Sequence, residues 1–306
     1  MISSIDPSSE RFLADLSRIQ SEINTAERQT SSGLKISQPS DAPEQLSSLL
    51  RIQADLDRNA QVTNNLAEVK SETDSAESSL ETATQLLDRA TSLAAQGANF
   101  TQNASARQAA AQEVTSILQE LVGLSQTSVL GRYVFSGDTP QQPSYSLDLT
   151  AANGVDRLLT TSATRQVVDA TGVAFTIGHT AQDIFDHRNP DDSLAPDNVF
   201  AAVNSLRTSL LANDQAGVTA ALAALHTAGD YMGTQLGFYG SVQSRIQDAT
   251  DFASQQRVQL QTEQSQIQDA DVAQAALDLA QGNAQLNTAL NAEAKRPRTS
   301  LFDYLA

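Results

Sequence analysis

Hydrophobic residues near both ends of the chain recur at alternating steps of four and three positions. The members of the first set are Phe12, Leu16, Ile19, Ile23 and Ala26. The members of the second set are Val272, Ala276, Leu279, Leu286 and Leu290, with Asn283 as the one polar member. This is the spacing of a coiled-coil seam, in which apolar positions repeat every ~3.5 residues. The pattern predicts two helices at opposite ends of the chain that pair with each other.

Long helices are predicted to follow the first seam. The first helix opens at Asp6 and runs to about Thr30. A second helix restarts with Asp41 as its N-cap, and Glu44 stands at the capping-box position three residues later. Its apolar stripe continues to Gly97, which makes it on the order of 80 Å long at 1.5 Å per residue. A rod of this length is typical of a filament or a signalling stalk rather than of a compact domain.

The middle of the chain changes from helical to strand-like patterns. A third helix is expected over 104–129, antiparallel to the second because their connection is short. From 131 to 196, short β-branched pieces are broken by Gly, Pro, Asn and Asp. Strands are expected at 165–168 and 173–177, on either side of a turn at Gly172. An insert of this size buries little core of its own, so it should lean on the helices.

Helices return after the insert in nearly mirrored order. One is expected to begin with Asp197 as its N-cap and to end at Leu211, and a long helix then runs to Asp269 and Asp271, where the terminal helix begins. The predicted fold class is mainly α. It is an elongated antiparallel helical bundle or coiled coil formed by both chain ends, with a small β-rich insert in the middle.

Three domains are predicted from this order. Residues 1–40 and 270–306 form a terminal coiled-coil domain. Residues 41–130 and 197–269 form a helical rod domain. Residues 131–196 form a β-rich outer domain at the turning point of the chain.

Composition narrows the possible functions. The formal charge is −17, from 36 acidic and 19 basic residues, whereas a protein that binds nucleic acid needs a basic footprint. We interpret the one basic run, Lys295, Arg296 and Arg298, as cations that oppose the negative end of a helix dipole. Aromatic residues make up only 5% of the chain and tryptophan is absent, which suits narrow helical seams rather than a thick core.

Several classes of site and of targeting are not expected. The chain has no cysteine, which excludes disulfides, thiolate metal sites and cysteine nucleophiles. The first residues, MISSIDPSSERF, show no basic segment followed by an apolar run, so no cleavable signal peptide is expected. No stretch approaches ~18 uninterrupted apolar residues, so no membrane insertion is expected.

The chemistry-bearing residues point away from catalysis. His179 and His187 lie near four acidic residues, Asp183, Asp186, Asp191 and Asp192. Their spacing does not fit an EF-hand loop, and a solvated loop is the preferred interpretation over a metal site. His226 is interpreted as an ordinary helix residue. Nucleophile elbows, phosphate loops and zinc-protease motifs are absent, so no catalytic residue, cofactor or metal is predicted.

The seams themselves have two interpretations. Apolar residues at helical spacing usually form an intramolecular core, and this is accepted for the long middle helices. Two terminal helices alone bury little and would fray in water, so packing between subunits is expected to supply the missing burial. The predicted subunit-interface residues in these helices are Phe12, Leu16, Ile19, Ile23, Val272, Leu279, Leu286 and Leu290.

The segment from Ile23 to Pro43, INTAERQTSSGLKISQPSDAP, resembles the N-terminal signature of the flagellin family. The matching positions are Ser31, Ser32, Gly33, Leu34, Lys35, Ile36, Ser40, Asp41 and Pro43. The segment IQDADVAQAALDLAQGNAQLNTALNAEA resembles the terminal helix of the same family. The resemblance covers both helical arms.

Two further segments resemble the members of this family that join the flagellar hook to the filament. They are GRYVFSGDTPQQPSY at the entry to the insert and SLFDYLA at the end of the chain. The second adds four residues to the expected subunit interface, Leu301, Phe302, Tyr304 and Leu305. Pro297 is a departure from the pattern, because proline interrupts or kinks a helix.

The resemblance implies a structural, non-enzymatic role outside the cell. It implies export in unfolded form by the flagellar type III apparatus, and a dedicated export chaperone on the C-terminal helix. It also implies a homo-oligomeric ring between an adjacent hook-associated protein and the filament flagellin. A filament-forming flagellin is the first alternative. A soluble chemoreceptor-like signalling hairpin is less favoured, because it predicts neither the interruption at Gly33–Pro43 nor the β-rich insert.

Overall fold

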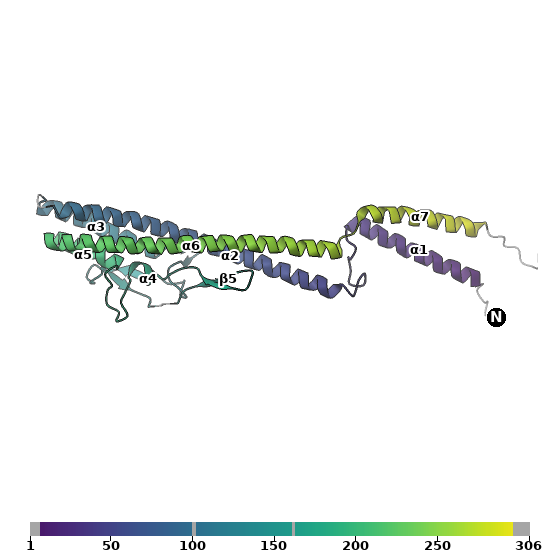
Figure 1. The fold of residues 1–306 in the computed structure, drawn as a ribbon, viewed down its shortest axis with the longest axis horizontal. Coiled ribbons are helices and arrows are strands. Elements are labelled where there is room, and N and C mark those ends of the chain that lie inside the picture. The colour runs from purple at the N-terminus through teal and green to yellow at the C-terminus, as the bar shows by residue number, and fades with distance from the viewer. Residues whose placement is uncertain (1–6, 100–101, 161–162, 296–306) are drawn as a thin grey trace, which may run out of the picture. The chain divides into compact units, whose positions relative to one another are not determined.

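The computed structural model describes residues 7–99, 102–160 and 163–295 (Figure 1). Within these residues it contains seven helices and three two-stranded antiparallel sheets, so the predicted mainly α fold class is confirmed. The chain divides into two compact units. The first, called the terminal unit below, comprises residues 1–58 and 256–306. The second, called the central unit, comprises residues 59–255.

Four helices form the bundle of the central unit. Their bounds are Leu46–Gly97 (α2), Ala104–Ser125 (α3), Val199–Leu211 (α5) and Gln215–Gln268 (α6), and α2 and α6 each extend into the terminal unit. The core between them is aliphatic, as the periodicity predicts. Its fully buried members include Leu80, Leu87, Leu118, Leu121, Leu206, Val218 and Met232.

The insert between α3 and α5 consists of three hairpins and one short helix. The strand bounds are Ser128–Val129 (β1), Arg132–Tyr133 (β2), Tyr145–Leu147 (β3), Val155–Arg157 (β4), Gln166–Val168 (β5) and Ala174–Thr176 (β6). Each strand pairs with its neighbour in sequence, with Ser128 opposite Tyr133, Tyr145 opposite Arg157 and Gln166 opposite Thr176. The expected hairpin at 165–177 is confirmed, and Gly172 takes a φ of 88° in its turn. The short helix Ala181–Phe185 (α4) is an element that the periodicity does not predict.

The insert packs against the bundle through aromatic side chains, as its small size requires. Phe135 meets Tyr239 of α6 edge to face, with ring centroids 6.4 Å apart, and both side chains are fully buried. The imidazole of His179 stacks on Phe238 at 3.8 Å. The imidazole of His187 stacks on Tyr231 at 4.8 Å. Such contacts add to the free energy of area burial by about 0.5–1.5 kcal/mol per pair.

A buried carboxylate ties the insert to the start of α5. Asp186 is fully buried, and four side chains donate hydrogen bonds to it: Tyr145 at 3.1 Å, Asn153 at 2.9 Å, Asn198 at 2.8 Å and Arg188 at 2.8 Å. Burial and the neighbouring carboxylate of Asp186 raise the pKa of the Tyr145 phenol. A buried charge is tolerated only when it is paired in this way.

Two helix starts differ from the sequence prediction. The helix α2 begins at Leu46 rather than Asp41, because the Asp41 carboxylate accepts hydrogen bonds from the backbone N–H groups of Ser37 and Gln38 and so closes a local turn. These backbone hydrogen bonds lower the pKa of Asp41. The N-cap of α5 is Asn198 rather than Asp197. Asp197 instead lies 2.7 Å from Nδ1 of His187.

The third helix also ends earlier than predicted, at Ser125, and the chain turns into the β1–β2 hairpin. The two central residues of this turn, Leu130 and Gly131, have φ values of 52° and 77°. Two positive φ angles are the mark of a type I′ hairpin turn, where asparagine and glycine are preferred. A leucine in this left-handed region costs about 1–2 kcal/mol. The Leu130 side chain is 86% exposed, so burial within the monomer does not offset that cost.

We predict that Asp186→Ala destabilises the central unit by about 3 kcal/mol or more, because it leaves Arg188 and three further donors without their shared acceptor. Urea unfolding followed by tyrosine fluorescence measures the change, since the chain has no tryptophan and four of its five tyrosines lie in this unit. The exposed Glu81→Ala on α2 is the matched control and should change the unfolding free energy by less than about 0.5 kcal/mol. Equal effects of the two substitutions would contradict the role given to Asp186.

A second prediction concerns alkaline pH. Burial, together with the carboxylates of Asp197 and Asp183, raises the pKa of Tyr231 to about 12, whereas an unfolded tyrosine titrates near 10. The stability that this group contributes is complete below pH 10, and it is lost as the pH rises through 12, because the unfolded chain releases the proton first. Urea midpoints should therefore fall between pH 10 and 12. The fall should be smaller for Tyr231→Phe than for Tyr133→Phe, and the same fall in both variants would disprove the assignment.

Candidate functional site at the paired terminal helices

The two ends of the chain meet in the terminal unit, as the paired seams predict. Its terminal helices are Pro7–Ser32 (α1) and Val272–Ala294 (α7), and they pack against each other (Figure 1). The connections that lead away from them are also hydrogen-bonded. The backbone N–H of Lys35 donates to the carbonyl of Gln268 at 2.7 Å, and that of Ala270 donates to the carbonyl of Gly33 at 2.9 Å. The two ends of the chain are thus joined by main-chain bonds as well as by side chains.

Local sequence explains why α1 ends and α7 begins at these connections. Gly33 has a φ of 70°, and its N–H donates to the carbonyl of Gln29, which is the behaviour of a glycine at a helix C-terminus. The residue Asp271 is the N-cap of α7, and its carboxylate accepts hydrogen bonds from the backbone N–H groups of Ala273 and Gln274. The sequence predicts an interruption at Gly33 and a new helix near Asp271, and the structure adds how each helix end is capped.

Small residues fill the seam between α1 and α7. The most buried members are Ile19 and Ala26 of α1 and Ala275 and Gly282 of α7. A Cβ atom on Gly282 would lie 2.7 Å from Cγ1 of Ile23. The glycine therefore sets how closely the two helices approach at this point.

The predicted interface residues divide into two groups. Ile19 is buried, and five others are half-buried: Phe12, Leu16, Ile23, Leu279 and Leu286. Val272 and Leu290, in contrast, are 46% and 47% exposed, so they are covered less completely than the others. The remaining four, Leu301, Phe302, Tyr304 and Leu305, lie outside the described residues, as does Pro297. Their assignment to a subunit interface stays a prediction.

Two seam residues of α7, Ala275 and Gly282, are not among the predicted interface residues. They share the register of Leu279 and Leu286, at steps of four, three and four. This register could have predicted both residues. The prediction instead favoured large side chains and so included Val272 and Leu290. Val272 lies seven residues before Leu279 and Leu290 lies four residues after Leu286, so both follow the same helical face, but about half of each side chain is exposed.

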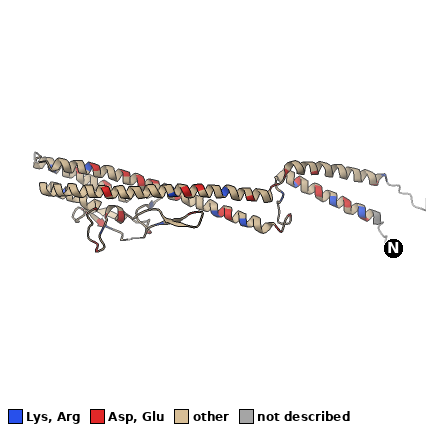
Figure 2. Cartoon of the chain, viewed as in Figure 1, with Lys and Arg blue, Asp and Glu red and all other residues tan. Residues whose placement is uncertain are grey.

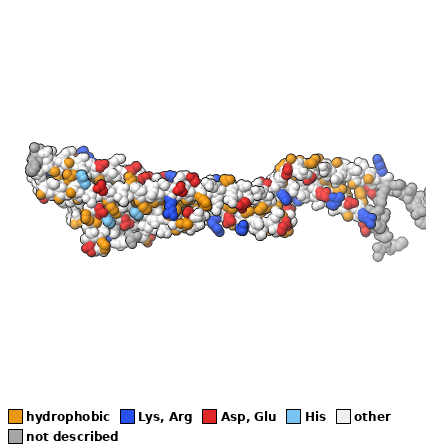
Figure 3. Space-filling model, viewed as in Figure 1, with side chains coloured by type: hydrophobic (Ala, Val, Ile, Leu, Met, Phe, Trp, Pro, Cys, Tyr) orange, Lys and Arg blue, Asp and Glu red, His pale blue; other side chains and the backbone are white. Residues whose placement is uncertain are grey.

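Much of the exposed surface of α7 is apolar and uncharged. Among its exposed residues are Val272, Ala276, Leu277, Ala280, Ala284 and Leu290. The helix carries only two charged residues, Asp278 and Glu293, whereas α1 carries charges of both signs along its length (Figure 2). Hydrophobic side chains are accordingly visible at the surface of α7 in Figure 3. Apolar residues without charged neighbours are typical of a surface that another molecule covers.

A groove of about 480 Å³ also stays open between α1 and α7. Polar side chains line most of it, including Glu22, Thr25, Gln29, Gln281 and Gln285. The pair is therefore not a closed core.

Lys295 is the C-cap of α7, while Arg296 and Arg298 of the predicted basic run lie outside the described residues.

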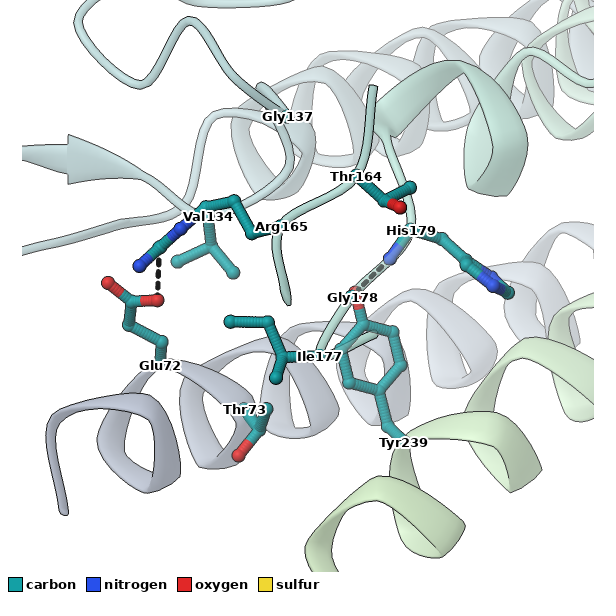
Figure 4. Close-up of a pocket in the computed structure, with 10 residues that line it drawn as sticks. All are labelled: Glu72, Thr73, Val134, Gly137, Thr164, Arg165, Ile177, Gly178, His179 and Tyr239. Atoms are coloured by element: carbon teal, nitrogen blue, oxygen red, sulfur yellow. Dashed lines mark hydrogen bonds and ion pairs between the residues drawn. The ribbon is translucent and has the colours of Figure 1, made fainter. Parts of the chain in front are cut away.

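The cavity shown in Figure 4 is of another kind. It lies where the insert meets α2 and α6, and its volume of about 20 Å³ suits a single water molecule rather than a cofactor. Arg165 points toward Glu72 and forms an ion pair with it. The hydroxyl of Tyr239 accepts a hydrogen bond from the backbone N–H of His179 at 3.2 Å. These contacts hold the insert in place.

The acidic and histidine residues of the insert have structural roles. Asp183 forms the capping box of α4 with Thr180, and Asp192 pairs with Arg157 at 2.9 Å. Asp191 accepts hydrogen bonds from Ser193. In the part of the chain that the structure describes, no three His, Asp or Glu side chains form a group that could hold a metal ion. In the same part, no helix has the length and apolar character needed to cross a membrane.

Comparison with known protein families gives two matches. Residues 8–139 match the model of the bacterial flagellin N-terminal helical region, and residues 219–305 match that of the bacterial flagellin C-terminal helical region. A comparison with curated proteins gives no match.

Several solved structures have a similar fold. A putative flagellar hook-associated protein from Vibrio parahaemolyticus is 20% identical, with a TM-score of 0.65 over 75% of this chain and 100% of that chain. FlgL from Bacillus cereus is 21% identical, with a TM-score of 0.57 over 70% of this chain and 99% of that chain. FlgL from Xanthomonas campestris is 16% identical, with a TM-score of 0.59 over 71% and 99% of the two chains.

The close approach at Gly282 generates a prediction about the terminal pair. We expect Gly282→Ala to loosen α1 from α7, because the new methyl group overlaps Ile23, even though alanine favours a helix over glycine. Hydrogen exchange of the monomer, read on peptides from α1 and α7, should become faster. Asn283→Ala at the adjacent exposed position is the control and should exchange at the same rate or more slowly, since it gains helix propensity without a clash. Slower exchange in Gly282→Ala would refute the contact.

Proposed function

Because the chain belongs to the flagellin family, we propose that it is a structural subunit of a bacterial flagellum that joins the hook to the filament. In this role it is the hook–filament junction protein, or hook-associated protein 3, of its flagellum. The role requires no catalysis. It requires subunits that pack side by side and that meet a different protein at each end.

The observation that carries the proposal is the open, uncharged side of α7. Val272, Leu277 and Leu290 are about half exposed there, although each is apolar. Burying a side chain of this size contributes about 1.5–3 kcal/mol, which the isolated subunit forgoes. A pair of helices that leaves such a side uncovered is stabilised when neighbouring subunits cover it.

Two observations favour a junction protein over the alternative, a filament-forming flagellin. The solved proteins of similar fold are described as a hook-associated protein and as FlgL, and the fold they share with this chain spans nearly all of their own length. The end of the chain, SLFDYLA, and the entry to the insert, GRYVFSGDTPQQPSY, resemble junction proteins rather than flagellins.

We extend the proposal to the partners and the location. The subunit-interface residues of a homo-oligomeric ring are those of the sequence prediction. The ring meets an adjacent hook-associated protein on one side and the filament flagellin on the other. The chain reaches the cell exterior unfolded, by type III export, and a chaperone covers the apolar side of α7 before export.

A deletion strain tests the proposal directly. Without this protein, cells should build hooks but release flagellin into the medium, as electron micrographs and the flagellin content of the medium will report. The wild-type gene should restore attached filaments. Attached filaments of normal length in the deletion strain would refute the junction role, and long filaments grown from the purified chain alone would favour the flagellin alternative.

Complementation of that strain tests the interface. We expect Leu290→Lys to fail to restore attached filaments, because it places a charge on the apolar side of α7. The matched control is Leu211→Lys at the end of α5, where the leucine is 53% exposed. The control should restore filaments, and circular dichroism of both purified variants checks that they remain folded. Full restoration by Leu290→Lys would remove this surface from the interface.

A further inference from the structure

We propose that the β1–β2 turn carries a second contact between subunits, in which the Leu130 side chain enters a hollow between α2 and α6 of a neighbouring copy of this chain. The proposal rests on the proposed function to the extent that copies stand side by side. It goes beyond that function because it assigns a contact to the central unit, with named residues on each partner.

Leucine at position 130 is conformationally unfavourable in the monomer. Three residues other than glycine have a positive φ within the described ranges: Leu130, Asp192 and Asn213. Asp192 and Asn213 are of the types that tolerate this conformation, and both side chains bind an arginine. Leu130 has neither advantage, and its side chain is 86% exposed. Strain combined with exposure is expected where a residue serves an interaction outside its own chain.

A positively charged residue, Arg132, lies close to Leu130 in the sequence. Arg132 follows two residues later, on β2, and its Nη1 lies 3.6 Å from Oε1 of Glu68, which is beyond hydrogen-bond length. Its Nε atom is buried and has no hydrogen-bond partner. The turn therefore presents an apolar side chain next to a half-buried arginine with a long ion pair to Glu68, on a chain whose net charge is −17.

The central unit also carries a hollow between α2 and α6, called the α2–α6 hollow below, that can receive the Leu130 side chain of another copy. It has a volume of about 300 Å³, within the range of pockets that hold small molecules, and so it can admit one aliphatic side chain. Leu87 and Leu225 lie at its floor, where they are 2% and 1% exposed, and nothing lies within 4 Å of where a Cβ atom of Gly229 would stand. Asp88 and Asp230 also line it and are exposed, so they offer acids to the partner's arginine.

The proposed contact is heterologous: each subunit presents one surface to one neighbour and a different surface to the other. The Leu130 turn and the α2–α6 hollow are different surfaces of one compact unit. A second copy of this chain is the occupant that we assign, because it supplies an exposed apolar side chain to the hollow and an arginine to the exposed acids beside it.

The first test replaces Leu130 by asparagine, a residue that is favoured in type I′ turns. Leu130→Asn should unfold at the same urea concentration as the wild type or a higher one. Its assembly, measured as the concentration at which the purified chain sediments as oligomers, should require on the order of tenfold more protein, since one buried leucine is lost. The control is Leu158→Asn, which changes another exposed leucine of the insert. The control should assemble as the wild type does.

The second test uses the absence of cysteine in the natural sequence. Leu130→Cys gives a single thiol, to which a benzophenone is attached, and the variant is mixed with an equal amount of ¹⁵N-labelled wild-type chain before assembly and illumination. Mass spectrometry should find cross-links to labelled peptides that contain residues 84–91 or 225–230. Cross-links confined to the same copy, or to other peptides of the labelled copy, would overturn the inference.

The outcomes separate this inference from the proposed function. If the wild-type chain assembles and Leu130→Asn assembles equally well, the inference fails and the proposed function stands. If the wild-type chain does not assemble at all and the deletion strain retains its filaments, both fail.

Discussion

The main-chain hydrogen bonds between the α1–α2 connection and the α6–α7 connection are the constraint on which the terminal unit depends. They join segments that are 232 positions apart, as in the bond from the backbone N–H of Ile36 to the carbonyl of Gln268. Closing so long a loop costs conformational entropy, and the cost is met because the residues between them fold into antiparallel helices. The order of helices along the chain follows from this requirement. Both arms must return to the same place.

The central and terminal units solve the packing problem differently. The central unit has a continuous core, in which side chains such as Leu80, Leu118 and Tyr239 are completely buried. The most buried positions of the terminal unit's seam include three small residues, Ala26, Ala275 and Gly282. Small residues let two helices approach closely, but they remove little apolar area from water. The seam thus fixes how closely α1 and α7 pack but contributes little to the free energy of unfolding. Any further burial of apolar surface requires contact with another molecule.

Much of the fold is predictable from the sequence because local signals and periodicity agree. Gly33 ends α1, Gly172 turns the β5–β6 hairpin, and Asp271 caps α7, each for a reason that concerns only its neighbours in sequence. Predictions failed where two local partners competed for one group. Asp41 could cap a helix, yet its carboxylate closes the preceding turn with Ser37 and Gln38. Such competition is decided by geometry that spacing does not contain.

The register of α7 shows why the candidate interface was only partly predictable. This helix has hydrophobic residues on two sides, and a heptad pattern can be drawn through either one. The monomer chooses the side with Gly282 because only a residue without a side chain admits Ile23 at that distance. Val272 and Leu290 follow the register of Leu279 and Leu286, yet about half of each side chain stays exposed. A periodicity weighted by side-chain size therefore selects large residues that are covered only in part, and it passes over the small residues that let the two helices approach closely.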